Sequence, residues 1–120
     1  MSDRIFLDNL RLKCRIGITE EERRELQEVM VDVSLIMNLK TAGKNDSMDS
    51  TIDYREVMQQ ISQFASKGEF RLLESLADGI ATHALKAFGV EGVIVKVRKA
   101  KYSSEPSIGI EIERERESNG

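Results

Sequence analysis

Hydrophobic and polar residues alternate along a long segment at the start of the chain, which predicts a β-strand over residues 5–16. Its apolar residues are odd-numbered up to Leu7 and even-numbered from Leu10 onward. Because successive side chains of a strand point to opposite faces, this change of parity predicts a β-bulge near Asp8 and Asn9. Gly17 then ends the strand.

A second segment alternates more regularly and predicts a long strand over residues 26–40. One face carries apolar residues from Val29 to Leu39, and the other face is mixed, as in a sheet that meets solvent or another subunit. The polar residues 40–50 that follow are predicted to form a loop.

Two segments with helical periodicity come next. Asp53 and Glu56 form a possible capping box for a helix that Gly68 ends. A second helix, with a wide apolar stripe over residues 72–88, is closed by Gly89.

The chain ends with two shorter alternating segments. Valines at positions 93, 95 and 97 predict a third strand, and the same parity continues to Lys99 and Lys101. Pro106 interrupts the pattern, and isoleucines at 108, 110 and 112 predict the last strand. The tail over residues 115–120 is expected to be frayed.

The order β-β-α-α-β-β predicts an α+β fold of one domain over residues 1–120, with a four-stranded, largely antiparallel sheet covered on one face by two helices. A strand as long as residues 26–40 is prone to aggregation when it lies unpaired at an exposed sheet edge. Closing the sheets of several subunits into one barrel removes such edges, so we expect a ring-shaped homo-oligomer.

Composition restricts the classes of function. The net charge of −3 and the pI near 5.3 argue against a nucleic-acid-binding protein. No stretch is long and apolar enough to predict a membrane span, and no targeting segment is recognised, so we expect a cytoplasmic protein. The single histidine, His83, cannot build a zinc site of several histidines within one chain.

Glu74 is the first candidate for a binding residue, since it lies where the apolar second helix begins. A carboxylate there can accept two parallel hydrogen bonds from adjacent N–H groups, such as the edge of a pterin or guanine ring. The alternative is an acidic residue that merely complements the helix dipole.

Three further residues have similar dual interpretations. A partly desolvated Lys101 could transfer protons near neutral pH, or it could simply extend into solvent at a strand end. Lys99 lies on the same face of the predicted strand and is a second candidate for this role. Glu22 could contact a ligand or form a capping box with Thr19. Tyr54 could stack on a heterocycle and exchange protons, or be a half-buried aromatic residue.

Six segments in this order resemble the dihydroneopterin aldolases and their sister enzymes, the dihydroneopterin triphosphate epimerases, over nearly the full chain. They are Ile5-Phe6-Leu7 with Gly17-Ile18-Thr19-Glu20-Glu21-Glu22; Gln27 followed by Val31-Asp32-Val33; Thr51-Ile52-Asp53-Tyr54 with Glu56-Val57; Leu72-Leu73-Glu74; Lys96-Val97-Arg98 leading to Lys101; and Gly109-Ile110-Glu111-Ile112-Glu113-Arg114.

The resemblance implies the tunnelling fold, a tetrameric β-barrel or a stacked octamer with active sites at subunit interfaces. It implies that Glu74 and the Leu73 backbone bind the pterin, that Tyr54 covers it and moves protons, and that the Ile52 backbone adds contacts. Glu22 would contact the reacting side chain.

By the same resemblance, Lys101 would be the general acid/base, and the substrate's own ring imine would replace any metal or organic cofactor. The implied reaction is the cleavage of 7,8-dihydroneopterin into 6-hydroxymethyl-7,8-dihydropterin and glycolaldehyde, as a step of folate biosynthesis.

Two departures leave the activity open. Aldolases commonly have proline after the lysine, where this chain has Tyr102, and the connection over residues 102–107 is short.

The alternatives are an epimerase that uses the same site, with Lys13, Arg15, Arg71 and Lys99 available to bind phosphates, and a non-catalytic pterin- or purine-binding protein. Element order alone also permits a small ferredoxin-like interaction domain.

Overall fold

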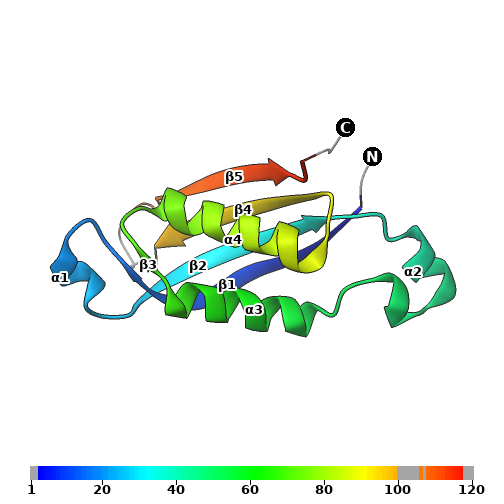
Figure 1. The fold of residues 1–120 in the computed structure, drawn as a ribbon, viewed down its shortest axis with the longest axis horizontal. Helices are drawn as coiled ribbons and strands as arrows, with labels where there is room; N and C mark the ends of the chain where they lie inside the picture. The colour runs from blue at the N-terminus through cyan, green and yellow to red at the C-terminus, as the bar shows by residue number, and fades with distance from the viewer. Residues whose placement is uncertain (1–2, 100–105, 107, 118–120) are drawn as a thin grey trace.

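The computed structural model describes residues 3–99, 106 and 108–117. Its elements follow the predicted order, with a short additional strand between the two long helices (Figure 1). They are β1 (Arg4–Ile16), α1 (Glu20–Arg23), β2 (Gln27–Ile36), α2 (Lys40–Asn45), the 3-10 helix η1 (Met48–Ser50), α3 (Tyr54–Lys67), β3 (Glu69–Phe70), α4 (Leu73–Phe88), β4 (Gly92–Lys99) and β5 (Gly109–Glu115).

Over the described residues, the sheet has five strands in the order β3-β1-β2-β4-β5, so the prediction of four strands was wrong by one. The four long strands pair antiparallel, as predicted. The additional strand, β3, runs parallel to the end of β1, with Arg15 opposite Glu69 and Ile16 opposite Phe70. A strand of two residues shows no alternation, so the sequence pattern could not reveal it.

The predicted bulge in β1 is confirmed. Leu7 pairs with Val33 and Leu10 pairs with Val31, so two residues of β1 lie opposite the single residue Asp32 of β2, one more than a regular ladder has. Asn9 adopts the left-handed conformation with φ of 60°, which asparagine tolerates better than most residues. Its backbone N–H donates to the Asp32 carboxylate at 2.7 Å.

The second strand is shorter than predicted, and the predicted loop contains helices. Ile36 pairs with Arg4 on one side and with Gly92 on the other, where both neighbouring strands begin. Beyond this point β2 has no ladder partners on either side, and the chain turns into α2 and η1. Asp46, with φ of 50°, ends α2 in the left-handed conformation.

The two long helices begin and end close to the predicted residues. Asp53 caps α3 by accepting a hydrogen bond of 2.9 Å from the Arg55 backbone N–H. The predicted capping box itself does not form, because the Asp53 side chain accepts from the Arg55 N–H and not from the Glu56 N–H, and Glu56 accepts from the Gln60 side chain at 3.2 Å. Gly89, with φ of 61°, ends α4 as predicted.

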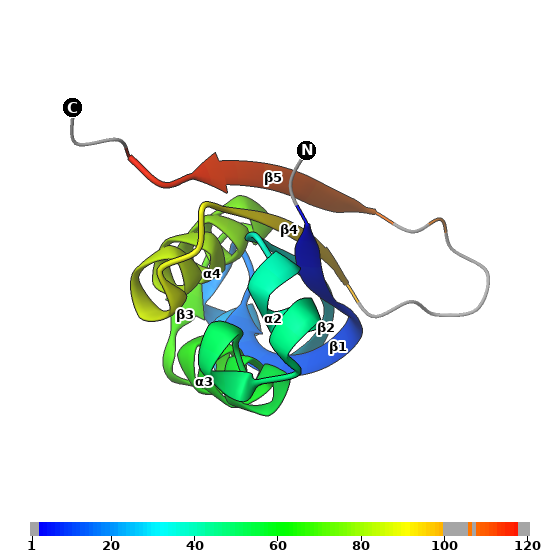
Figure 2. The ribbon, with the colours of Figure 1, turned by 90° about the vertical axis from the view of Figure 1, so that its right-hand side faces the viewer.

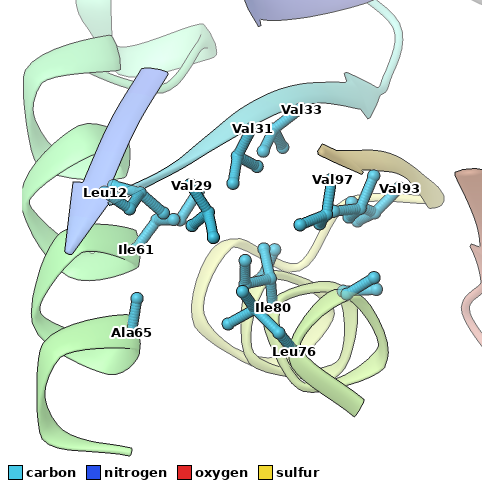
Figure 3. Packing of buried hydrophobic residues seen from close by; sticks show 14 of the residues in the cluster. Leu12, Val29, Val31, Val33, Ile61, Ala65, Leu76, Ile80, Val93 and Val97 are labelled. Carbon is cyan, nitrogen blue, oxygen red and sulfur yellow. The ribbon is translucent and has the colours of Figure 1, made fainter. Parts of the chain in front are cut away.

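Helices α3 and α4 cover one face of the curved sheet, α3 over β1 and α4 over β4 and β5 (Figure 2). Between the layers lies one core, in which valines of the sheet meet Ile61 of α3 and Leu76 and Ile80 of α4 (Figure 3). Within the part of the chain that is described, no helix combines the length and the apolar character that a membrane span requires. The core therefore fixes the ends of β1, β4 and α4 relative to one another.

Candidate functional site

A small hollow lies where β1 ends, α4 begins and β4 ends. Its volume is about 190 Å³, and its lining comes from four separate segments. The lining residues are Ile16, Gly17, Ile18, Glu22, Arg71, Leu72, Leu73, Glu74 and Lys99. Three of the predicted site residues, Glu22, Leu73 and Glu74, are therefore brought together by the fold.

Glu22 is fixed by a complete capping box at the start of α1. Its backbone N–H donates to the Thr19 hydroxyl at 3.2 Å, and its carboxylate accepts from the Thr19 backbone N–H at 3.2 Å and from the Thr19 hydroxyl at 2.9 Å. The two hydrogen bonds that the carboxylate accepts from Thr19, together with the nearby charge of Lys99, lower the pKa of Glu22 below its ordinary value. The structural interpretation of Glu22 is thus confirmed, and its place in the hollow keeps a ligand contact open.

Arg23 fixes the loop that carries the hollow, a role that the sequence did not reveal. Its guanidinium donates to the backbone carbonyls of Gly17 and Ile18, each at 2.9 Å, and to the Glu69 carboxylate at 2.9 Å. Gln27 adds a second link by donating to the carbonyl of Ile16 at 2.5 Å. The only sequence signal for Arg23 was its place in a run of charges, which is usually a solvated surface.

Glu74 reaches the hollow because β3 pairs with β1. The Gly17 N–H donates to the Phe70 carbonyl at 3.0 Å, so the connection from β3 into α4 lies beside the end of β1. Glu74 lies in the first turn of α4, where the N-terminal end of the helix favours a negative charge. Its side chain is exposed, and no hydrogen bond joins it to another described residue, so its carboxylate is free to accept from a ligand.

Lys99 adds an amine to this group of residues. It is the last residue of β4, follows the parity of the buried Val97, and lines the hollow with both acids. The preferred candidate, Lys101, lies outside the described residues, as does the rest of the predicted strand beyond Lys99. Of the residues that the structure describes, Lys99 is the lysine that lines the hollow.

Tyr54 and Ile52 are not part of this hollow. Tyr54 opens α3, and its side chain is 59% exposed. The 14 residues of α3 span about 20 Å, and the helix runs from Tyr54 toward the hollow. Ile52 precedes the same end of the helix and packs partly against the core. Within one chain, these two residues do not meet Glu74.

A larger hollow, of about 640 Å³, lies between α3 and α4 around Phe64 and His83. His83 and Gln60 form a hydrogen bond of 3.0 Å there. Most other lining side chains are glutamines, and none of the predicted site residues contributes to it. Size alone would select this hollow, but the convergence of two acids and an amine selects the smaller one.

The sequence model of the family described as "Dihydroneopterin aldolase" matches residues 5–113. The chain belongs to the dihydroneopterin aldolase family. A dihydroneopterin aldolase from Streptococcus pyogenes is 30% identical over 118 residues, which cover 95% of this chain and 99% of that protein. Longer proteins also match: the chain spans only 16% of the folic acid synthesis protein of Pneumocystis carinii and 17% of that of Dictyostelium discoideum, each 30% identical.

Solved structures of the dihydroneopterin aldolase family show the same fold. The enzyme from Burkholderia thailendensis, solved with bound guanine, has 26% identity and a TM-score of 0.77, covering 97% of this chain and 93% of that one. The Escherichia coli enzyme, solved with neopterin, has a TM-score of 0.85 over 93% of this chain and 98% of that one, at 23% identity. The predicted α+β class and the resemblance are therefore confirmed.

Proposed function

We propose that this chain is a dihydroneopterin aldolase, which cleaves 7,8-dihydroneopterin into 6-hydroxymethyl-7,8-dihydropterin and glycolaldehyde without a metal or organic cofactor. The observation that carries the proposal is the convergence of Glu22, Glu74 and Lys99 on one hollow. The neopterin and guanine complexes of two relatives support a ligand with an amino-pyrimidine edge.

Glu74 binds that edge in this proposal. A ring amide N–H and an adjacent amino group donate to its two carboxylate oxygens, and the Leu73 backbone adds a further contact. Because both residues belong to the first turn of α4, the rigid helix orients the ring relative to the ends of β1 and β4.

A lysine near the end of β4 then transfers protons. Its amine removes the proton from the hydroxyl on the second side-chain carbon, and the bond between the first and second carbons breaks. The electron pair of that bond moves to the ring imine, and the first carbon regains a proton as glycolaldehyde leaves. The position of Lys99 in the hollow supports it as this lysine, and Lys101, which the family resemblance implies for the role, is the alternative.

A comparison of Lys99→Ala with Lys101→Ala decides between the two lysines. We expect the responsible substitution to reduce kcat by several orders of magnitude while the affinity for a pterin, measured by calorimetry, changes little. Full turnover in both variants would exclude a lysine of this segment as the acid/base.

The hollow needs a second copy of the chain in this proposal. Its volume of about 190 Å³ is below the usual range for small-molecule sites, and Tyr54 lies at the distant end of α3. We therefore place Tyr54 and Ile52 of a neighbouring copy over the pterin, in a homo-oligomer of four or eight subunits.

Mixing two inactive variants tests this shared site. Glu74→Ala removes the ring contact and Tyr54→Ala removes the covering residue, so mixed oligomers regain sites that contain both intact residues. We expect activity to return only after the two variants are dissociated and reassembled together. If Tyr54→Ala alone keeps wild-type activity, Tyr54 is not part of the site.

The product assay tests the activity itself. The pure protein is incubated with 7,8-dihydroneopterin and with its triphosphate, and glycolaldehyde and the inverted side chain are measured. Glycolaldehyde from the unphosphorylated compound supports the aldolase. An inverted product from the triphosphate alone would favour the epimerase, and binding without either product would favour a pterin-binding protein.

A further inference from the structure

Arg98 contacts two other strands from the face of the sheet that the helices leave uncovered. It is the neighbour of Lys99 in β4, and because successive side chains of a strand point to opposite faces, its side chain lies on the other side from the hollow. Its guanidinium donates to the Asp32 carboxylate of β2 at 3.0 Å and to the Asn9 side-chain oxygen of β1 at 2.6 Å. Arg98 thus joins the end of β4 to β2 and to the bulge in β1.

Asn9 and Asp32 complete this network. The Asn9 backbone N–H donates to the second carboxylate oxygen of Asp32 at 2.7 Å. The side chains of Arg98 and Asp32 are only 20% and 23% exposed, so water screens their ion pair less than it screens a pair on an open surface. Because each carboxylate oxygen has its own donor, the network holds the three strands in one arrangement.

The end of β4 has few other restraints. Over the described residues, the ladder with β5 ends at Arg98 opposite Gly109, so Lys99 is paired only with Val29 of β2. The last residues of an element open more easily than its centre. A slip of one residue there would turn the Lys99 side chain to the uncovered face and away from Glu22 and Glu74.

We infer that Arg98 is a positioning residue, which keeps the end of β4 in register through Asp32 and Asn9 and thereby keeps the Lys99 amine in the hollow. It acts from the opposite face of the sheet and does not contact the substrate. This inference rests on the proposed function, because Lys99 is the group that the network serves.

Hydrogen exchange of backbone N–H groups tests the positioning without reference to activity. We expect Arg98→Ala to speed exchange at residues 97–99 at least about tenfold, because the anchored side chain next to Lys99 is lost. Exchange at residues 93–95, in the centre of β4, should change little.

Kinetics and binding test the consequence for the reaction. Arg98→Ala should lower kcat about 10- to 100-fold, since the amine is misplaced. The affinity for neopterin, measured by calorimetry, should change less than about twofold, because Glu74 on α4 holds the ring in the proposed site. Arg98→Lys should restore only part of kcat, since an ammonium lacks the planar set of donors that reaches two partners.

Asn9→Gly is a second variant that spares the bulge. Glycine adopts the φ of 60° without strain, so this substitution removes the bond to Arg98 and leaves the backbone N–H that Asp32 accepts. It should lower kcat in the same direction as Arg98→Ala, by a smaller factor. The double variant should have the kcat of Arg98→Ala, because both substitutions remove the same contact.

Arg11→Ala is the matched control. Arg11 lies on the same uncovered face and forms an ion pair of 3.0 Å with Glu28, but its side chain is 72% exposed. Its loss should change neither exchange at residues 97–99 nor kcat. Unchanged exchange there in Arg98→Ala, faster exchange with unchanged kcat, or equal effects of Arg11→Ala would overturn the inference. Absence of product from the wild type would instead refute the proposed function, and exchange would still decide whether Arg98 holds the end of β4.

Discussion

A Cβ atom on Gly17 would lie 2.4 Å from the Cβ of Glu22 and 3.0 Å from its carboxyl carbon. Real Cβ atoms do not approach so closely, so the capped turn that carries Glu22 can lie against the end of β1 only because residue 17 has no side chain. The position of one acid of the hollow thus depends on the absence of a methyl group on the preceding loop.

We predict that Gly17→Ala displaces Glu22 and the Gly17–Ile18 loop, and lowers kcat/KM at least about tenfold, since small misplacements of positioned groups have large effects on rate. Enzyme kinetics and thermal unfolding of the same sample separate the effect on the site from that on the fold. Gly43→Ala is the control, because a Cβ there meets no atom within 4 Å. Equal kinetic effects of both substitutions would contradict the prediction.

Arg23 should contribute more to stability than an ordinary surface arginine. Its side chain is only 10% exposed, and removing it leaves two carbonyls and Glu69 without their donor. We expect Arg23→Ala to lower the free energy of unfolding by about 1–3 kcal/mol in urea titrations.

Arg55→Ala provides the comparison for Arg23. The Arg55 side chain is 76% exposed and its ion pair with Asp53 measures 3.4 Å, so its loss should cost less than about 1 kcal/mol. If the two variants unfold at the same urea concentration, the links of Arg23 to the loop have no net effect on stability.

The pKa of Glu22 should depend on Thr19. Backbone and hydroxyl hydrogen bonds from Thr19 lower this pKa, so they stabilise the folded protein at neutral pH, and their contribution is lost as the pH falls through the lowered pKa. Thr19→Val removes the hydroxyl bond and should move the pKa of Glu22 upward toward its ordinary value, as measured by a carboxyl-carbon NMR titration. Thr41→Val, in α2, should leave it unchanged; an unaltered Glu22 titration in Thr19→Val would disprove the role of the hydroxyl.

Cys14 should be chemically inert in the folded protein. Its side chain is fully buried in the core, and burial raises the pKa of the thiol from 9.0 to about 11. At pH 8 this leaves about a hundredfold less thiolate than an ordinary cysteine has. Labelling with a thiol reagent should proceed only as fast as the protein unfolds, and rapid labelling of the native protein would refute this expectation.

The long strands and helices could be predicted from the sequence because each buries one face over many residues, which imposes a periodic pattern. The buried face of β1 is the clearest example, because the change of parity near Asn9 predicted the bulge that the structure shows. The short strand β3 could not be predicted, since its two residues are defined by pairing with β1 and show no pattern of their own.

The site was predictable only in part. Glu22 and Glu74 could be proposed from local motifs, and both line the hollow. Parity could not choose between Lys99 and Lys101, because two residues separated by one position lie on the same face of a strand. Arg23 could not be found at all, since its partner carboxylate on Glu69 lies 46 residues away in the sequence.

The bulge in β1 has a consequence for changes in chain length. Asp32 and Arg98 both contact Asn9, Arg98 through a bond of 2.6 Å to its side chain, so the irregularity is anchored to two neighbouring strands. Because Asp8 and Asn9 together oppose the single residue Asp32, deleting one of them would leave a regular ladder in which Leu10 still pairs with Val31 and faces the same side as Leu7. Shortening the chain by one residue here should therefore straighten β1 and remove the contacts of Asn9, while the same side chains stay in the core.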